Sequence, residues 1–124
     1  MEAVNGNRTL GQKGESTACE YLLSLGHVIL ERNYRSPYGE IDIISLDGDR
    51  TVFTEVKTRS ALPQNSKYGR ASSAVTKSKK ENFILTAKCY QRDNPDSLRC
   101  RIDVIEVYMI GKDEPIINHI KSAF

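Results

Sequence analysis

The sequence has few of the residues on which disulfide frameworks, zinc sites and thiol catalysis depend. Its three cysteines are an odd number, and they include no CxxC pair and no histidine at zinc-ligand spacing. We therefore predict that Cys19, Cys89 and Cys100 are small buried residues in a reducing compartment, with no part in the chemistry.

Long apolar runs are also missing. The longest, around Ile41 to Ile44, are far shorter than the ~18 residues that a membrane-spanning helix needs. Residues 1–6 are polar and acidic and lack the apolar core of a signal peptide. We expect a cytoplasmic protein that is neither exported nor embedded in a membrane.

What the chain does contain suits one folded domain. Its 124 residues match the usual size of a domain, and 39% hydrophobic with 27% charged residues excludes a disordered composition. Internal repeats and linkers rich in Pro or Gly are absent from the sequence, so we predict a single domain over residues 1–124, with residues 1–8 as a loose N-terminus.

Charge is unevenly distributed along this chain. Acidic residues outnumber basic ones over residues 1–49, and basic residues predominate over 50–101, although the formal net charge is only +2. This pattern indicates carboxylates gathered at one place and a surface facing a polyanion at another. Nucleic acid is therefore the first partner to test.

The hydrophobic periodicity and turn residues predict an α/β (α+β) fold of order αβββαββ, with a central mixed β-sheet flanked by helices. The expected helices cover 9–26, with Thr9 as N-cap and Gly26 as terminator, and 73–92. The expected strands cover 28–30, 40–46, 51–58, 98–110 and 116–120, with a turn-rich stretch at 33–37 and a long polar loop at 59–71.

The second and third strands form a hairpin whose register can be predicted from the turn at residues 47–50. If Gly48 and Asp49 occupy the centre of the turn, Asp42 lies opposite Glu55 and Glu40 lies opposite Lys57. Opposed Cβ atoms are ~4.5–5.5 Å apart, close enough for two carboxylates to share one cation. A slip of one residue would undo this arrangement.

Two facing carboxylates repel one another unless a cation or a raised pKa compensates. Mg²⁺ binds through one or two carboxylates, and a nearby lysine could manage charge on a phosphate or a water. The alternative is an exposed face of cross-strand ion pairs, with Glu40 beside Lys57. That alternative leaves Asp42 opposite Glu55 unexplained.

Two short motifs in this hairpin, Gly39-Glu40-Ile41-Asp42 and Glu55-Val56-Lys57, resemble the PD-(D/E)xK signature of the restriction-endonuclease-like superfamily, of whose leading Pro-Asp pair only the Asp is present. The fuller pattern resembles the small bacterial YraN family of that superfamily, which is similar to archaeal Holliday-junction resolvases. It extends over residues 11–124 and includes Gly11, Gly14, Glu15, Ala18, Tyr21, Leu22, Gly26, Arg32, Asn33, Arg35, Arg59, Lys77, Arg101 to Ile105, Ala123 and Phe124.

The resemblance implies a restriction-endonuclease-like fold that binds Mg²⁺ or Mn²⁺. Asp42 and Glu55 would be metal ligands together with the carbonyl of Val56, and Lys57 would be the catalytic lysine. Glu15 matches the first-helix glutamate that resolvase-like members bring to the metal, although a solvated helix residue is the alternative. For Glu40 two roles stay open: an acid that supports the ligands, or only the ion-pair partner of Lys57.

Weaker candidates surround this site. A rim that contacts phosphates is predicted at Arg59, Lys67, Arg70, Lys77 and Lys80, although each taken alone could be an ordinary surface charge. Asp103 interrupts an apolar run, which indicates a hydrogen-bonded structural role. His27 and His119 are interpreted as non-catalytic, and Phe124 is expected to seal an apolar surface.

Together these patterns favour a Mg²⁺-dependent nuclease that acts on structured or branched DNA. Branched-junction resolvases commonly pair two active sites, so the resemblance leaves a homodimer open. The alternative is a module that binds nucleic acid and keeps the nuclease fold without catalysis; a purely structural domain has only the composition in its favour. Asp42, Glu55 and Lys57 distinguish these functions, because a binding module has no need of opposed carboxylates beside a lysine.

Overall fold

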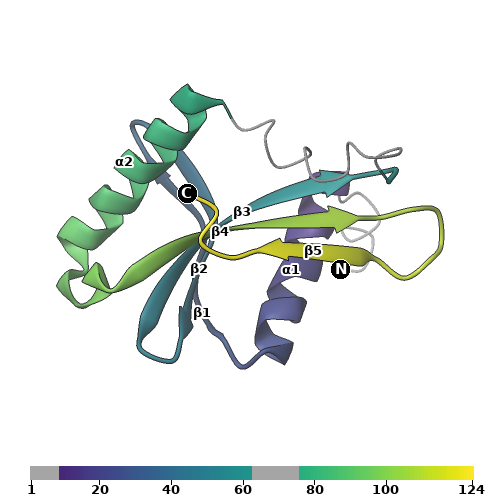
Figure 1. The fold of residues 1–124 in the computed structure, drawn as a ribbon, viewed down its shortest axis with the longest axis horizontal. Helices are drawn as coiled ribbons and strands as arrows, with labels where there is room; N and C mark the ends of the chain where they lie inside the picture. Colours follow the sequence, from purple (N-terminus) through teal and green to yellow (C-terminus); the bar gives the residue numbers. More distant parts are fainter. Residues whose placement is uncertain (1–8, 63–75) are drawn as a thin grey trace, which may run out of the picture.

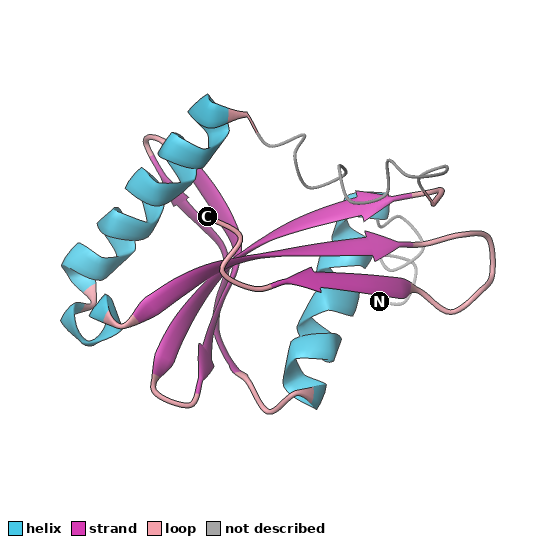
Figure 2. Ribbon diagram, viewed as in Figure 1, coloured by secondary structure: helices cyan, strands magenta, loops and turns pink. Residues whose placement is uncertain are grey.

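The computed structural model describes residues 9–62 and 76–124, in which five strands form one mixed sheet between two helices. The elements are α1 (Leu10–Ser24), β1 (Val28–Ser36), β2 (Gly39–Asp47), β3 (Arg50–Arg59), α2 (Lys77–Asp93), β4 (Cys100–Tyr108) and β5 (Ile116–Ile120), with a short 3₁₀ helix at Pro95–Leu98 (Figures 1 and 2). This confirms the expected order αβββαββ. Within the described ranges, no helix is long and apolar enough to cross a membrane.

The strands lie side by side in chain order, from β1 to β5. Neighbouring strands are antiparallel except for β3 and β4, which are parallel and are connected through α2. A parallel pair needs such a crossover because its second strand must start at the same end of the sheet as its first. The mixed sheet predicted from the sequence is therefore present.

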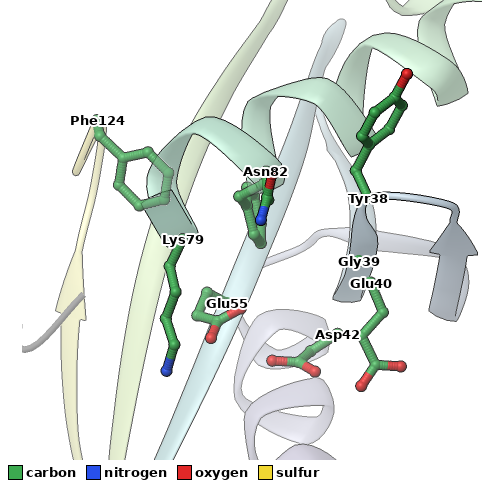
Figure 3. A pocket seen from close by; sticks show the side chains of 9 residues that line it. Tyr38, Gly39, Glu40, Asp42, Glu55, Lys79, Asn82 and Phe124 are labelled. Carbon is green, nitrogen blue, oxygen red and sulfur yellow. The ribbon is translucent and has the colours of Figure 1, made fainter. Parts of the chain in front are cut away.

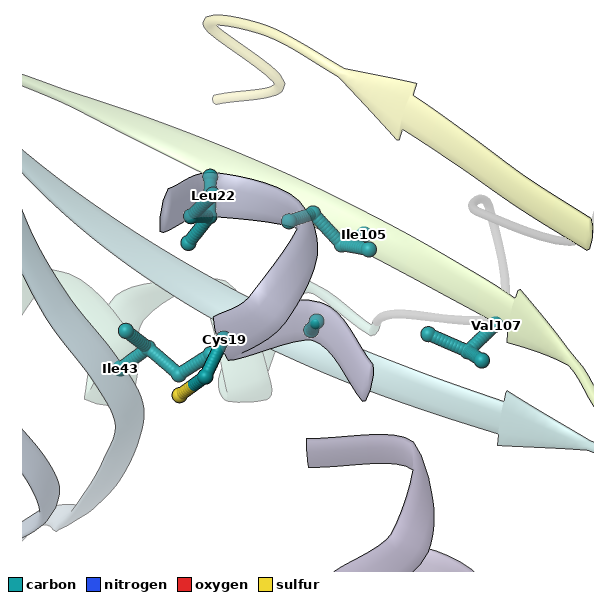
Figure 4. Packing of buried hydrophobic residues seen from close by; sticks show 6 residues of the cluster. Cys19, Leu22, Ile43, Ile105 and Val107 are labelled. Carbon is teal, nitrogen blue, oxygen red and sulfur yellow. The ribbon is translucent and has the colours of Figure 1, made fainter. Parts of the chain in front are cut away.

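Each helix covers its own hydrophobic cluster. Ala18 and Leu22 of α1 pack with Ile43, Ile105 and Val107 of the sheet (Figure 4). A second cluster joins α2 to the sheet through Phe83, Ala87, Tyr90, Ile41, Ile44 and Phe53. Val56 packs against the first cluster and Phe53 belongs to the second, as expected for strand residues an odd number of positions apart.

Helix α1 begins and ends where the sequence predicts. Thr9 caps it by accepting a hydrogen bond from the N–H of Gln12 at 3.1 Å, while the Gln12 side chain accepts from the N–H of Thr9 at 2.9 Å. The chain leaves the helix at Leu25, and Gly26 follows with φ +94°, a left-handed conformation that suits glycine.

Strand β1 is longer than predicted, because it continues through the stretch expected to be turn-rich and ends at Ser36. Most of its side chains are exposed, since β1 lies at the edge of the sheet. Polar residues therefore occur in it as freely as in a turn, and Asn33 adopts φ 55° within the strand. Sequence periodicity alone therefore could not distinguish an exposed edge strand from a turn-rich stretch.

The predicted boundaries of α2 and β4 were wrong as well, and β4 ends at Tyr108 rather than at residue 110. Helix α2 begins at Lys77 because Thr76 is extended and caps the N–H of Lys79, so the predicted start at residue 73 is incorrect. Strand β4 begins at Cys100 because the 3₁₀ helix takes up residues 95–98. The predicted loose terminus (1–8) and most of the predicted loop (63–71) lie outside the described residues.

The prediction that all three cysteines are buried is also wrong. Cys19 packs in the core under α1 and Cys89 is half-buried, but Cys100 is exposed at the start of β4. All three are free thiols. The shorter β4 explains the error, because Cys100 lies at the end of the strand rather than within it.

Candidate functional site

The hairpin of β2 and β3 opens at the point where the acidic residues begin. Its ladder pairs Ile44 with Phe53 and ends at Ile43 opposite Thr54, which confirms the predicted register. Beyond that point β2 continues its pairing with β1, and β3 continues with β4. The two predicted pairs that follow, Asp42 with Glu55 and Glu40 with Lys57, are therefore not part of the ladder.

Asp42 occupies the opening between the two strands. Its Oδ2 accepts a hydrogen bond from the backbone N–H of Val56 at 2.7 Å. The side chain thus replaces the main-chain partner that β2 no longer provides for β3. This bond fixes the carboxylate beside Glu55 and Val56, two of the residues predicted to bind a metal.

The surroundings of Asp42 disfavour its negative charge. The residue is only 8% exposed, and burial raises the pKa of its carboxyl to about 7. The Val56 hydrogen bond lowers this pKa, while the neighbouring carboxylates of Glu55, Glu15 and Glu40 raise it. A cation at this position would stabilise the charged form, so the residues present fit a divalent ion.

A pocket of about 220 Å³ opens at this point between the sheet and α2. The carboxyl groups of Glu40, Asp42 and Glu55 gather on one side of it, and Lys79 and Asn82 reach toward them from α2 (Figure 3). The remaining lining residues are Tyr38, Gly39, Phe83 and Phe124.

Lys57 is held next to the pocket by Glu55. Its Nζ lies 3.4 Å from Oε2 of Glu55, and both side chains are largely buried. Glu40 pairs instead with Arg35, whose Nε is 3.4 Å away across the β1–β2 ladder. The alternative in which Glu40 serves as the partner of Lys57 is therefore wrong, because β2 and β3 separate before those residues can meet.

Helix α1 approaches the same site through Gly14. A Cβ at this position would overlap the side chain of Thr58 on β3, coming within 2.8 Å of its Cβ. Glu15, the next residue, is half-buried and close enough to raise the pKa of Asp42. Yet no three Asp, Glu, His or Cys side chains of the described segments stand close enough together to share a metal. Asp42 and Glu55 stay the predicted ligands, and the contact of Glu15 with this site that the structure supports is its charge acting on Asp42.

The predicted rim of basic residues is only partly brought together. Lys77 is exposed at the start of α2, and Nζ of Lys80 lies 5.8 Å from the ring centre of Phe124. Arg59 lies at the end of β3, where its Nη2 is 3.8 Å from Oε2 of the buried Glu106. Lys67 and Arg70 lie outside the described residues.

Sequence reasoning missed three of the residues that line the pocket. Lys79 and Asn82 share a face of α2 with Phe83, a spacing that the sequence displays once the helix start is known. Tyr38 lies in the turn between β1 and β2 and carries no local signal. Phe124 was expected to seal an apolar surface, and its ring packs edge-on against Phe83 at 5.5 Å between centroids.

Asp103 has the structural role predicted for it. It is fully buried and accepts hydrogen bonds from Arg101 Nε at 3.0 Å and from the N–H of Ser122 at 3.0 Å, with Nε2 of His119 at 2.7 Å. The other ring nitrogen of His119 is 3.0 Å from the hydroxyl of Tyr21. None of these residues lines the pocket, so nothing in their contacts points to catalysis.

Sequence comparisons match most of this chain to one protein family. Residues 14–107, which run from Gly14 into β4, match the sequence model of "Uncharacterised protein family UPF0102". A UPF0102 protein of Caldicellulosiruptor saccharolyticus is 44% identical over 94% of this chain and 98% of its own length, and one of Clostridioides difficile is 44% identical over 95% and 98%. A relative in Rhodococcus jostii is 41% identical over 95% of this chain and 98% of its own length. The chain belongs to the UPF0102 family.

Proposed function

We propose that this protein is a Mg²⁺-dependent nuclease that hydrolyses phosphodiester bonds in structured or branched DNA, with Mn²⁺ as an alternative ion. The observation that carries the proposal is the opening between β2 and β3, where Asp42 and Glu55 line one pocket and Lys57 lies against Glu55. The same arrangement supports a place among the PD-(D/E)xK nucleases, similar to the archaeal Holliday-junction resolvases.

Asp42 and Glu55 would hold the ion, with the Val56 carbonyl as a further oxygen. Two carboxylates are sufficient for Mg²⁺, which usually keeps several of its waters and also takes oxygens from a substrate phosphate. When bound, the ion supplies Lewis-acid polarisation of the phosphate.

The neighbouring groups would orient the ligands, position Lys57 and set the charge of the site. The N–H of Val56 fixes the orientation of Asp42, so that this carboxylate needs no reorganisation when a ligand arrives. Glu55 positions the ammonium of Lys57 at 3.4 Å, where it can neutralise charge that develops on the phosphate. Glu15 and Glu40 act on Asp42 through their charge.

Helix α2 supplies the cationic side of the site. Its first turn contains Lys77, Lys79 and Lys80 and no acidic residue. The N-terminus of a helix already carries partial positive charge, so three lysines there are unfavourable unless an anion is bound. A DNA backbone is such an anion, and its negative charge is compatible with the acids of the site once the ion is present.

The test combines metal binding with cleavage on the same preparations. Titration calorimetry with Mg²⁺ and Mn²⁺ on the wild type, Asp42→Asn and Glu55→Gln should show binding that both variants weaken at least tenfold, because each removes a charged ligand. Asp49→Asn is the matched control, since Asp49 is exposed at the hairpin turn and does not line the pocket.

Cleavage is then measured on a four-way junction and on a linear duplex of the same sequence. Wild type and Asp49→Asn should cut, and Lys57→Ala should bind the DNA without cutting it. Light scattering on each mixture shows whether one or two copies of the protein bind a junction. Specific DNA binding by a wild type that neither binds metal nor cuts would overturn the proposal in favour of a module that only binds nucleic acid.

A further inference from the structure

The pocket has a second side that the proposed metal chemistry does not use. Lys79, Asn82 and Phe83 lie at positions i, i+3 and i+4 of α2, so they share the face of the helix that lines the pocket. Lys79 and Asn82 point from this face toward the acids of β2 and β3 (Figure 3). The side chain of Asn82 offers both a hydrogen-bond donor and an acceptor. The pocket is therefore acidic on one side and polar, cationic and aromatic on the other.

Two aromatic rings, those of Tyr38 and Phe124, stand on either side of Asn82, and the backbone of each is tied to the fold by a hydrogen bond nearby (Figure 3). Tyr38 is 49% exposed, and its N–H donates to Oγ of Ser36 at 3.0 Å. The Ser36 hydroxyl also lies 2.8 Å from Oγ1 of Thr86, and this hydrogen bond ties the β1–β2 turn to α2.

Phe124 is anchored on the opposite side. The N–H of the preceding residue, Ala123, donates to the carbonyl of Ile102 at 2.7 Å, and the ring of Phe124 contacts Phe83. Neither ring is needed to hold a metal, and an exposed tyrosine beside a polar pocket offers a surface on which a flat ligand can stack.

The size and charge of the pocket restrict what it can accept. At about 220 Å³ it is smaller than the ~300–1,000 Å³ pockets that bind drug-sized ligands, so it holds one ring system rather than a stacked pair. A second phosphate group, besides the one at the proposed ion, would be repelled by the carboxylates of Glu40, Asp42 and Glu55. A nucleobase is uncharged at neutral pH and would not be repelled. Lys79 is then free to contact the phosphate attached to that base.

We propose that this pocket receives a single unpaired nucleotide of the DNA strand, next to the phosphate that the nuclease cuts. Tyr38 stacks on the base, Phe124 forms the opposite wall, Asn82 hydrogen-bonds to the exposed base edge, and Lys79 contacts the phosphate. A paired base cannot enter, because its faces and its edge are already occupied within the duplex. The inference rests on the proposed function, and it makes single-stranded ends or unpaired positions the feature of structured DNA that is recognised.

Binding is measured on the full chain in EDTA, which prevents cleavage, and again with Ca²⁺, which offsets the charge of Glu40, Asp42 and Glu55 through oxygen ligands; the preference should be present in at least one of the two conditions. The probes are a blunt duplex and the same duplex with a short single-stranded extension, each carrying 2-aminopurine at the junction nucleotide. Wild type should bind the extended DNA more tightly and change its 2-aminopurine fluorescence. Tyr38→Ala and Asn82→Ala should each lose about 5- to 100-fold of that preference, because stacking and edge contacts are lost, with the affinity for blunt duplex unchanged.

Matched controls separate this effect from general charge and folding. Lys79→Gln should weaken binding of the extended DNA more than Lys88→Gln, which removes an exposed lysine of the same helix away from the pocket. Tyr38 and Asn82 are both exposed, so Tyr38→Ala and Asn82→Ala should melt within a few degrees of wild type. Leu98→Ala, which shortens an exposed apolar side chain away from the pocket, is the control for the loss of side-chain atoms.

Equal affinities for blunt and extended DNA in both conditions, or a preference that Tyr38→Ala and Asn82→Ala retain, would overturn the inference. Displacement of the extended DNA by a free nucleoside monophosphate as effectively as by a single-stranded oligonucleotide would also overturn it, because the site would then bind free nucleotides. If the preference is found but Mg²⁺ causes no cleavage, the pocket assignment stands and the proposed function fails. If cleavage is found without the preference, the proposed function stands and the pocket assignment fails.

Discussion

Gly14 of α1 lies directly against the side chain of Thr58 on β3. A Cβ at Gly14 would overlap the threonine hydroxyl and come within 2.8 Å of its Cβ and Cγ2. This contact allows α1 to pack closely on the strand that carries Glu55 and Lys57. It also places Glu15 near Asp42, so a packing requirement and the electrostatics of the site depend on the same glycine.

Gly14→Ala should therefore destabilise the protein by about 1–3 kcal/mol, the usual penalty of overpacking, despite the better helix propensity of alanine. Thr58→Gly in the same chain should restore much of that loss, because it removes every side-chain atom that the new methyl group would meet. Urea unfolding of the four proteins of this double-mutant cycle measures the coupling.

Gly11→Ala is the control on the same helix. A Cβ there would meet only Oγ1 of Thr9, at 3.9 Å, so the substitution should stabilise the protein by up to about 1 kcal/mol through helix propensity. Equal stabilities for Gly14→Ala and Gly11→Ala would show that α1 is not held against Thr58.

Asp103 should be the carboxylate on which stability against acid depends most. Burial alone would raise its pKa, but hydrogen bonds from His119, Arg101 and the N–H of Ser122 outweigh this and lower the pKa below its usual value. A depressed pKa stabilises the folded protein above the pKa of the unfolded chain, and this contribution is lost as the pH falls.

Asp103→Asn should then cost about 3–5 kcal/mol at pH 7, because it removes the buried charge that pairs with Arg101 and His119 and leaves Arg101 only the part-exposed Asp47 as a charged partner. The difference from wild type should begin to shrink as the pH falls below about 3.8, the pKa of this carboxyl in the unfolded chain, because the ionised form then stabilises the folded protein less. Asp49→Asn, which alters an exposed ion pair with Arg99, should change the stability by less than about 0.5 kcal/mol. Denaturant unfolding across this pH range decides; a loss independent of pH would contradict the prediction.

The parts of this site that the sequence predicts are those set by local geometry. The register of the hairpin follows from a short turn and alternating residues, so the neighbourhood of Asp42, Glu55 and Lys57 could be predicted without a structure. The opening between β2 and β3 could not, because it arises where each strand continues its pairing with another neighbour. The hydrogen bond from Val56 to Asp42 exists only as a consequence of that opening.

The other side of the pocket depends on contacts between elements distant in the chain. Lys79 and Asn82 reach the acids of the sheet only because α2 crosses over from β3 to β4 and packs on that face. Tyr38 takes its place through Ser36 and Thr86, which are 50 positions apart. Helical periodicity identifies a face of α2, but it cannot say which residues of the sheet that face will meet.

Asp42 should make the stability of the metal-free protein fall as the pH rises. Burial raises its pKa to about 7, so between about pH 4 and pH 7 the folded protein retains a proton that the unfolded chain has released. Over that interval this group costs up to about 1.4 kcal/mol of stability per pH unit. Asp42→Asn has no such proton and can still accept the Val56 hydrogen bond.

The stability of Asp42→Asn relative to wild type should therefore increase from pH 4 to pH 7 and stay constant above it, in unfolding experiments with EDTA present. Glu20→Gln, an exposed substitution on α1 away from the pocket, should follow the wild-type curve. A constant difference between Asp42→Asn and wild type over the whole pH range would mean that Asp42 ionises in the folded protein as easily as in the unfolded chain.

Divalent cations should offset the stability that the buried Asp42 carboxyl costs, because they bind the folded protein and not the unfolded chain. A ligand at tenfold its Kd adds about 1.4 kcal/mol to the stability of the form that binds it, which for a chain of this size is a rise of roughly 3–6 °C in Tm. The rise with Mg²⁺ should be larger at pH 8 than at pH 6, because at the lower pH the ion competes with the proton on Asp42. Asp42→Asn and Glu55→Gln should lose most of it, whereas Asp49→Asn should keep it. Potassium chloride at matched ionic strength controls for screening of the charges around the pocket, and an equal rise with potassium, or in Asp42→Asn, would show that the ion acts elsewhere on the surface.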